Sequence, residues 1–231
     1  MEHAMYTLHI ANKNYSSWSL RPWALMTELS IPFIEVISPF KEGSNWDEFR
    51  NFSPTGLVPS LIDGDQVIWD SLGIVEYLFE RYPEVWPEAP NARAWARCAS
   101  AEMHSGFSSL RNQCSMNCGL RIKLKEITTN LQKDLTRIDE LWNEGLSRFK
   151  GPYLAGNKFT AVDAFYAPVA FRVRTYGLDM SPASQNYVNL ILSAKSVLAW
   201  EEAALKESWR EAAHERESLK FGILIEDLRK D

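Results

Sequence analysis

The sequence predicts two domains, an α/β domain over residues 1–82 and an all-helical domain over residues 91–231. In the first 82 residues, short strand-like and helix-like patterns alternate, which is typical of an α/β unit. Three prolines then fall within residues 83–90, a stretch that cannot continue a helix and forms a stiff linker. After this linker, nearly all of the chain has the apolar spacing of helices.

The first domain is predicted to contain a strand, a helix, a second strand, a short helix, a hairpin and a third helix. Their ranges are 6–10, 20–29, 33–37, 46–52, 60–62 with 66–69, and a helix from 71 to at least 78. Asp63-Gly64 is the expected hairpin turn, because this dipeptide accepts the positive φ angles that tight turns require.

The second domain is predicted to contain long helices over residues 93–117, 123–149, 162–175, 184–195 and 197–209. Thr160 and Asp163 form a capping-box-like pair before the third of these helices, and Phe159 is placed as a hydrophobic staple. We expect Asp163 to accept hydrogen bonds from backbone donors in a buried turn and to take no part in chemistry.

Composition excludes several classes of protein. Of the 231 residues, 45% are hydrophobic and 24% are charged, which is typical of a soluble globular protein. The net charge of −5 argues against general nucleic-acid binding, which needs a basic face. No apolar run approaches the roughly 20 residues of a membrane span, and the first residues lack the layout of a signal peptide. We therefore expect a cytoplasmic protein with neither a nucleic-acid nor a membrane partner.

The cysteines point to a reducing compartment and not to a metal site. The chain has three, Cys98, Cys114 and Cys118, and an odd number is harmless where thiols stay reduced. Cys114 and Cys118 are expected on one face of a helix, but nothing supplies further ligands at the usual spacing. The four histidines are scattered along the chain. We expect no bound metal.

Residues 57–71 combine a backbone clamp with an anion site. Pro59 suits a strand start because it lacks a backbone donor, and a cis bond before it would make a tight turn. Such a turn leaves the N–H and C=O of Val58 free to pair with an extended peptide. Asp70 and Ser71 precede a helix whose unpaired N–H groups and positive dipole end favour a carboxylate. The competing interpretation is a hairpin followed by an ordinary capped helix.

This order of elements and residues resembles the glutathione transferase family. Residues 51–61, which read NFSPTGLVPSL, are similar to the family's NPxGxVPxL turn, and residues 153–163 are similar to its YLxGxxxTxAD element. The resemblance implies a thioredoxin-like first domain and glutathione as co-substrate. It also implies that Val58, before Pro59, pairs with the cysteinyl unit, that Ser71 holds the γ-glutamyl carboxylate, and that Asp70 faces the γ-glutamyl amine.

In this family, the loop after the first strand supplies a hydroxyl that donates a hydrogen bond to the glutathione sulfur. Residues 16–21 resemble the SSCSWR start of zeta-class enzymes, which favours Ser16 as the donor with Ser17 a close second. Tyr15 is a third candidate, because tyrosine has this role in other classes. Trp18 stands where the zeta class has cysteine, so redox chemistry through a protein thiol is not expected. Without the resemblance, a serine at a helix start is most often an N-cap.

Further contacts to the substrates are less sharply defined by the sequence. Lys41, or else Arg50, could pair with the glycine carboxylate of glutathione, and the competing interpretation is a solvated surface lysine. Residues near Met103, Phe107 and Leu110 are expected to line an apolar pocket over the sulfur, where the family binds its second substrate.

The resemblance covers nearly the whole chain and implies attack of the glutathione thiolate on a small apolar electrophile, in a homodimer with two-fold symmetry. The stretch 82–86 is expected to expose aromatic surface to such a partner. One alternative is a glutathione-dependent cis–trans isomerase of maleyl-type substrates, similar to maleylacetoacetate isomerase. It needs cations at the second site, for which Arg21, Arg111 and Arg172 or Arg174 are available. The other alternative is a non-catalytic binding protein with the same fold.

Overall fold

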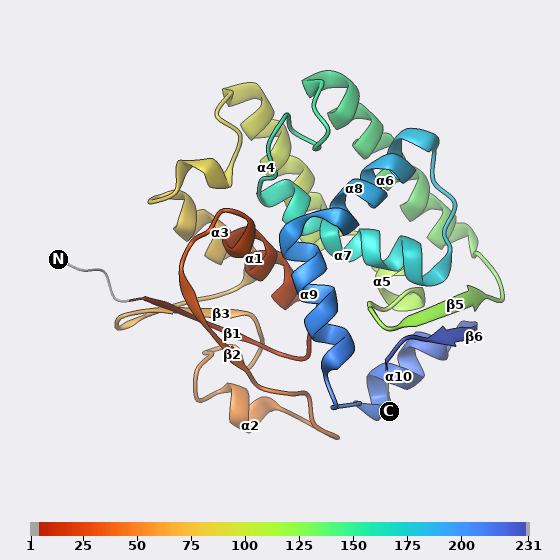
Figure 1. The fold of residues 1–231 in the computed structure, drawn as a ribbon, viewed down its shortest axis with the longest axis horizontal. Coiled ribbons are helices and arrows are strands. Elements are labelled where there is room, and N and C mark those ends of the chain that lie inside the picture. Colours follow the sequence, from red (N-terminus) through yellow and green to blue (C-terminus); the bar gives the residue numbers. More distant parts are fainter. Residues whose placement is uncertain (1–4, 230–231) are drawn as a thin grey trace.

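The computed structural model of the protein describes residues 5–229. A four-stranded sheet of order β2-β1-β3-β4 forms the centre of the first domain. Its strands are β1 (Tyr6–Ile10), β2 (Phe33–Ile37), β3 (Ser60–Asp63) and β4 (Gln66–Ile68), with β1 parallel to β2 and β3 antiparallel to both neighbours. Helices α1 (Ser17–Glu28) and α3 (Ser71–Phe79) lie on one side of the sheet, and α2 (Trp46–Phe49) lies on the other (Figure 1). This arrangement confirms the thioredoxin-like first domain.

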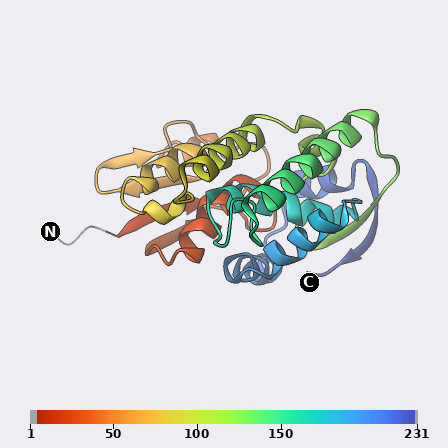
Figure 2. The ribbon, with the colours of Figure 1, turned by 90° about the horizontal axis from the view of Figure 1, so that it is seen from above.

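Most of the remaining chain is helical. After a short 3-10 turn at Pro83–Val85, the helices are α4 (Pro90–Ser105), α5 (Ser108–Gln113), α6 (Thr129–Phe149), α7 (Ala161–Tyr176), α8 (Pro182–Ser193), α9 (Lys195–Lys206) and α10 (Ala212–Leu219). Every residue of α7 except Arg174 is buried, because this helix packs against α1, α4 and α8 at once. Seen from above, the sheet and the helical domain occupy opposite ends of an elongated molecule (Figure 2).

The segment between the two domains differs in detail from its prediction. Helix α4 begins at Pro90, which suits the first turn of a helix because its missing N–H would have no partner there. The exact limits of the two domains stay a prediction. The expectation that residues 82–86 expose aromatic surface is wrong for Trp86, which is only 1% exposed and belongs to the core, while Tyr82 is half-buried.

Helix α1 connects the two domains. Its side chains Leu20, Ala24 and Leu25 are fully buried. One side of the helix contacts β1 and α3, and the other contacts α7 and α9. Trp23 on α1 meets Trp200 on α9 edge to face, with ring centroids 5.2 Å apart. The first turn of α1 is therefore held between the domains, where a ligand can contact both.

Two predicted long helices are interrupted. The helix expected over 93–117 ends at Ser105, because Gly106 follows and Phe107 takes a positive φ of 58° before α5 begins. The helix expected from 123 begins only at Thr129, where the Thr128 hydroxyl accepts a hydrogen bond from a backbone N–H in the first turn. Cys114 and Cys118 consequently lie outside helices, which corrects the expectation that they share a helical face.

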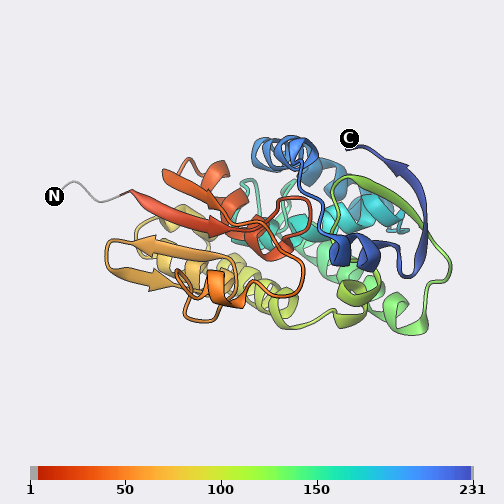
Figure 3. The same ribbon diagram turned by 90° about the horizontal axis from the view of Figure 1, so that it is seen from below.

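The second domain also contains two strands that the sequence analysis assigned to helix or left unassigned. Strand β5 (Leu120–Leu124) pairs with β6 (Gly222–Asp227) in an antiparallel ladder from Leu120↔Asp227 to Leu124↔Gly222. Gly222 is required at the end of this ladder, because a Cβ there would overlap the Ile122 side chain. The two strands curve around one end of the helical domain, with α10 between them and the first domain (Figure 3). The C-terminal part of the chain is thereby fastened next to the junction of the domains.

The predicted turns around the sheet are confirmed. Gly64 has a φ of 58° in the hairpin between β3 and β4, and the Val58–Pro59 bond is cis. Asp163 is fully buried and accepts hydrogen bonds from the backbone N–H groups of Thr160 and Leu154. Its structural role before α7 is as predicted.

Two searches of residues 5–229 gave negative results. In that range, no helix is long and apolar enough to cross a membrane. Within the same residues, no three His, Cys, Asp or Glu side chains come together as a possible metal site. Burial raises the pKa of the Cys114 thiol to about 12, so this cysteine is not a thiolate at neutral pH.

Candidate active site

A cavity of about 290 Å³ lies where the two domains meet, close to the lower limit of roughly 300 Å³ for small-molecule sites. The start of α1 contributes Tyr15, Ser16, Ser17 and Trp18. The segments around α2 and before β3 contribute Phe40, Phe49, Leu57 and Val58, and the second domain contributes Arg111, Ser115, Met116, Arg172, His214 and Glu217. The structure thus brings both predicted serines and the predicted valine into one wall.

The two serines have different hydrogen bonds. Ser16 is the N-cap of α1, where its Oγ accepts from the Ser19 N–H and donates to the Ser19 Oγ at 2.7 Å. Ser17 is the first residue of the helix, and its hydroxyl has no hydrogen-bond partner within residues 5–229. Both side chains are largely buried, with 5% and 7% exposed. Only the Ser17 hydroxyl is therefore free to donate without breaking an existing bond.

Tyr15 uses its hydroxyl proton elsewhere. The hydroxyl donates to Glu215 on α10, and Arg229 forms an ion pair with the same carboxylate. Burial, followed by the hydrogen bond to Glu215, raises the pKa of Tyr15 to about 12. Tyr15 therefore anchors the C-terminal segment to the α1 loop and does not point a free proton into the cavity.

Val58 presents an unpaired stretch of backbone. It precedes the cis bond to Pro59, which is buried beneath it, and strand β3 begins only at Ser60. Neither the N–H nor the C=O of Val58 forms a backbone hydrogen bond within the described part of the chain. An extended peptide could take up both groups in the manner of an added strand.

Asp70 lines a second cavity of about 370 Å³ together with His104, whereas the neighbouring Ser71 does not line it. Asp70 is the N-cap of α3, and its Oδ1 accepts from the N–H groups of Leu72 and Gly73. Ser71 is fully buried, and its Oγ accepts from Arg21 Nη1 at 3.3 Å.

Trp18 stands between the two cavities. It lines the first cavity, and its ring meets the ring of His104 from the second cavity with centroids 5.2 Å apart. The guanidinium of Arg21 also packs over Trp18, 4.1 Å from the ring centroid. Asp70 and Ser71, which are predicted to bind the γ-glutamyl unit of glutathione, are thus close to the first cavity but separated from it by this side chain. The first cavity, which Ser16 and Ser17 line, is called the serine cavity below.

The remaining predicted contact residues lie outside the serine cavity. Lys41 is exposed, and its Nζ is 2.6 Å from a carboxylate oxygen of Glu48. Arg50 is exposed and packs over the ring of Trp46. The role predicted for Lys41 or Arg50 stays a prediction.

The expected apolar lining from α4 and α5 differs from the observed one. Met103, Phe107 and Leu110 are buried in the core. The cavity wall is formed instead by residues that follow Leu110 in the sequence, including Arg111 and Met116. The wall is thus more cationic than the sequence analysis expected.

Three guanidinium groups lie around this cavity: Arg21 and Arg111 pack over Trp18, and Arg172 lines the cavity wall. Asp70 and Asp134 act on the charges of Arg21 and Arg111 from a distance. Arg172 donates to the carbonyl oxygens of Cys114 and Pro168, and Arg111 donates to backbone carbonyls. Arg21 Nε and Nη2 are buried with no hydrogen-bond partner among the described residues. No ion pair involving any of the three occurs within residues 5–229.

The pKa values reflect this crowding of positive charge. Burial and then the neighbouring Arg111 lower the pKa of Arg172 to about 10. Burial, followed by Arg111 and Arg172, lowers the pKa of Arg21 well below its ordinary value. Arg172 remains charged at neutral pH, so the domain interface holds buried positive charge that no carboxylate of residues 5–229 pairs with directly.

His214 was not identified by the sequence analysis. It lies on α10, lines the serine cavity, and is stacked between the rings of Tyr15 and Phe40, with centroids 5.1 Å and 4.6 Å away. Its Nδ1 is 2.8 Å from Glu211 Oε2. The local signal was Glu211 three residues before His214, the spacing at which an N-cap carboxylate accepts from a backbone N–H in the first turn of a helix.

Family models match both domains. A model of the glutathione S-transferase N-terminal domain matches residues 11–86, and a model of the C-terminal domain matches residues 124–211. The chain belongs to the glutathione S-transferase family. In this transferase, α10 and β6 lie beyond both matched ranges, so His214 is outside the part that the family models describe.

Individual relatives agree with this assignment. Glutathione S-transferase 1 of Dianthus caryophyllus is 30% identical over 155 residues, which are 64% of this chain and 68% of that protein. A probable maleylacetoacetate isomerase of Vibrio cholerae is 29% identical over 140 residues, 58% of this chain and 65% of that protein. The matched stretch spans about two thirds of these relatives.

A crystal structure of a Burkholderia glutathione transferase homolog with bound glutathione has the same fold. Its TM-score is 0.65 at 20% identity, and the match covers 87% of this chain and 98% of that one.

Proposed function

We propose that this protein attacks a small electrophile with the thiolate of glutathione. The observation that carries the proposal is the single cavity that contains the Ser16 and Ser17 hydroxyls and the unpaired backbone of Val58. Glutathione conjugation is also the activity that family membership supports. Pairing of the cysteinyl unit with Val58 would direct its sulfur toward the first turn of α1, where the helix dipole favours an anion.

The required stabilisation is within reach of such a site. A free thiol has a pKa near 8.5, and lowering it by about two units takes about 2.7 kcal/mol of preference for the thiolate. One charge-assisted hydrogen bond supplies about 1.5–3 kcal/mol. We assign this bond to Ser17, because its hydroxyl is unpaired, and we assign Ser16 to positioning of the helix start.

The test compares Ser17→Ala with Ser16→Ala. Calorimetry measures glutathione binding, and the ultraviolet band of the bound thiolate is titrated against pH. Ser17→Ala should raise the apparent pKa of the bound thiol by about 1–2 units with little change in affinity. Ser16→Ala should instead lower the free energy of unfolding by roughly 1 kcal/mol, because an N-cap is lost.

The outcomes separate the possible assignments. A shifted titration in Ser16→Ala alone would return the donor role to Ser16. Unchanged titrations in both variants would remove the hydroxyl mechanism. Absence of glutathione binding at millimolar concentration in the unmodified protein would refute the proposed function.

The two ends of glutathione are assigned to different residues. Ser71 would donate its proton to the γ-glutamyl carboxylate, since its Oγ already accepts from Arg21, and Asp70 would face the γ-glutamyl amine. Lys41 or Arg50 would bind the glycine carboxylate. Comparing the glutathione affinities of Lys41→Gln and Arg50→Gln decides between these two, and unchanged affinity in both removes the assignment.

A second candidate function is isomerisation of a maleyl-type dicarboxylate, which the positions of Arg111 and Arg172 favour. Both line the cavity, and neither is paired with a carboxylate among the described residues. Uncompensated buried charge is costly, so an anionic substrate would be stabilised there. Two probable maleylacetoacetate isomerases, from Caenorhabditis elegans and Vibrio cholerae, are among the relatives.

A panel assay distinguishes the functions. Glutathione is combined with an aryl halide, a hydroperoxide or maleylacetone, and turnover is measured for each. Turnover of maleylacetone alone would select the isomerase. Glutathione binding without turnover of any of them would select the non-catalytic binding protein.

The proposal includes a two-fold homodimer and a cytoplasmic location. The dimer rests on the family resemblance. The location is supported by the three free cysteines, of which Cys98 is exposed and would be at risk of pairing in an oxidising compartment.

A further inference from the structure

Deprotonation of a thiol requires a group that accepts its proton, and the serine cavity contains few such groups. A serine hydroxyl can donate to a thiolate but is too weak a base to take the proton. Tyr15 donates its own proton to Glu215, and the arginines that line the cavity are donors only. The acceptors in the wall are therefore the imidazole of His214 and the carboxylate of Glu217.

Base strength favours the imidazole. An ordinary glutamate has a pKa near 4.3, whereas an ordinary histidine has a pKa near 6.5 and is matched to proton transfer at neutral pH. Efficient general bases have pKa values close to the working pH. Glu217 is also exposed, so its carboxylate is solvated.

The ring of His214 is held in a defined orientation. Glu211 Oε2 accepts from both the backbone N–H and the Nδ1 of His214, each at 2.8 Å, and Glu211 is only 7% exposed. A proton on Nδ1 leaves Nε2 as the accepting nitrogen. No described residue forms a hydrogen bond with Nε2.

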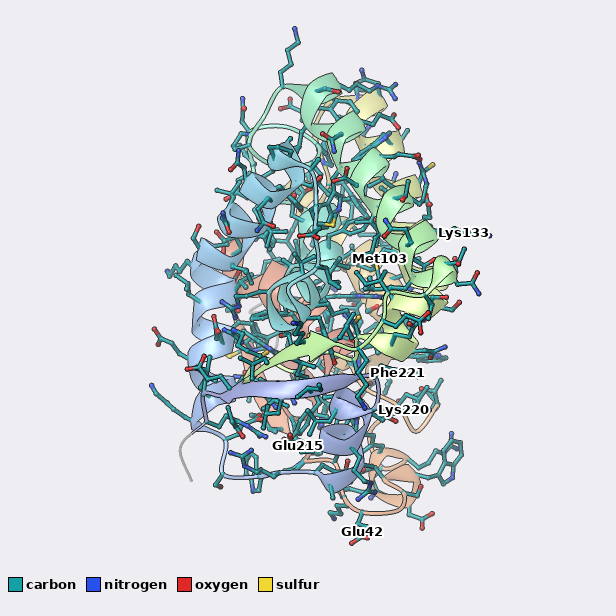
Figure 4. The ribbon with its side chains drawn as sticks, turned by 90° about the vertical axis from the view of Figure 1, so that its right-hand side faces the viewer. Glu42, Met103, Lys133, Glu215, Lys220 and Phe221 are labelled. Atoms are coloured by element: carbon teal, nitrogen blue, oxygen red, sulfur yellow. The ribbon has the colours of Figure 1, made fainter. Side chains whose placement is uncertain are left out.

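The helix that carries His214 is fixed to the rest of the molecule from both ends. Tyr15 and Arg229 both bind Glu215 on α10, and β6 pairs with β5. Figure 4 shows Glu215 on α10 below β6, with Lys220 and Phe221 in the turn between them. These contacts place the imidazole against the loop that carries the serines.

We infer that His214 is a catalytic base that takes the thiol proton of bound glutathione; this inference rests on the proposed function. The S–H bond breaks, its electron pair stays on sulfur, and the proton moves to Nε2. The products are a thiolate and an imidazolium, and Glu211 is the counter-ion of the imidazolium through Nδ1–H. After the thiolate attacks, the imidazolium releases its proton to water.

Charged groups from every neighbouring element act on this imidazole. Glu211 is the N-cap of α10 and lies against the imidazole, Glu215 and Glu217 lie on α10 itself, and Glu215 is already paired with Arg229 from the C-terminal segment. Arg111 and Arg172 line the same cavity, and their positive charge favours a thiolate there. The direct contact with Glu211 is the interaction that is specific to the protonated ring.

The test counts protons. Glutathione is mixed with the protein in weak buffer at about pH 7.5, above the ordinary histidine pKa of about 6.5. The thiolate formed is measured by its ultraviolet band, and the protons released are measured with an indicator dye. The unmodified protein should release fewer than about half a proton per thiolate, because His214 retains the rest, and His214→Phe should release about one.

The variants separate proton transfer from packing. His214→Phe preserves an aromatic ring between Tyr15 and Phe40 but has no nitrogen. Glu211→Gln keeps an oxygen that can accept from the N–H groups of His214 but loses the negative charge that balances the imidazolium. This variant should also release closer to one proton per thiolate. Arg216→Gln, an exposed site on the same helix, should behave as the unmodified protein. In His214→Phe, kcat/KM should fall by about 100-fold or more.

The possible outcomes each decide the question. About one proton per thiolate in His214→Phe against fewer than about half in the unmodified protein, or loss of the thiolate band in His214→Phe at unchanged affinity, supports the base. Equal proton release in the unmodified protein and His214→Phe overturns it, while the proposed function stands. If His214→Phe fails to fold, an unchanged release in Glu211→Gln overturns it. No thiolate band in the unmodified protein overturns the proposed function and this inference together.

Discussion

Replacing Asp163 by alanine should destabilise the protein without removing its chemistry. Besides a longer bond from the Thr160 hydroxyl at 3.4 Å, the carboxylate accepts three shorter ones, from the N–H of Leu154 at 3.1 Å, the N–H of Thr160 at 3.0 Å and the hydroxyl of Tyr187 at 2.9 Å. All three bonds are buried, and water cannot replace the lost acceptor without opening the turn before α7.

The size of the effect follows from two opposing contributions. A buried donor without a partner costs about 1–3 kcal/mol, so three of them cost about 3–9 kcal/mol. The carboxylate is itself unfavourable, because burial outweighs its hydrogen bonds and raises the pKa of Asp163 from 3.8 to about 6. Removing the carboxylate therefore also removes about 3 kcal/mol of destabilisation of the folded state at neutral pH. We expect a net loss of about 3 kcal/mol, or a Tm lower by roughly 6–12 °C in a chain of this length.

Urea unfolding followed by circular dichroism measures this loss, with Asp179→Ala as an exposed control that should change stability by less than about 0.5 kcal/mol. The pKa of Asp163 is higher in the folded than in the unfolded state. The stability that comes from protonating Asp163 in the folded state is therefore fully present below pH 3.8, and it is lost as the pH rises through about 6. The difference in free energy of unfolding between the unmodified protein and Asp163→Ala, called the gap below, should be larger at about pH 5 than at about pH 7.5. Normal stability with abolished activity, or a gap that narrows at the lower pH, would refute this reasoning.

Three other predictions concern binding and assembly. Ser71→Ala should weaken glutathione binding by about 1.5–3 kcal/mol in calorimetry, the range for a hydrogen bond to a charged group, and unchanged affinity would contradict the assigned carboxylate site. Arg172→Met should raise the KM for maleylacetone by roughly tenfold or more while sparing an uncharged aryl halide, and an equal effect on both would argue against an anionic second substrate. Light scattering at micromolar concentration should give a mass near twice 26.5 kDa, and a single species at 26.5 kDa would exclude the homodimer.

Local patterns predicted the helices and strands of the first domain, and the family resemblance supplied their thioredoxin-like arrangement. The strands over 6–10 and 33–37 have the predicted limits, because their apolar residues and flanking turn residues are all near in sequence. The Val58–Pro59 turn and the Asp63-Gly64 hairpin also depend on residue types that strongly restrict backbone conformation. The family resemblance, and not the order of these elements, placed the serine loop and Val58 in one site.

Contacts between distant segments were not predictable in the same way. Strand β5 alternates buried Leu120 and Ile122 with more exposed neighbours, but this short pattern is stable only when β6 pairs with it about a hundred residues later. The arginines and His214 were visible as residue types. Which of them would face the cavity depends on how the helices rotate and pack, and one sequence does not reveal this.

The loop between β1 and α1 depends on the end of the chain. Glu207 accepts from the N–H groups of Lys13 and Asn14, and Trp200 donates to the Lys13 carbonyl. The ribosome synthesises about 5–20 residues per second, so this loop leaves it well before Trp200 and Glu207 do. The sheet can fold as soon as the first domain has emerged, whereas the loop gains these bonds only when residues 200–207 are free. We expect a chain interrupted before that point to have a sheet without an ordered serine loop, so incomplete products of translation would leave the cell's glutathione untouched.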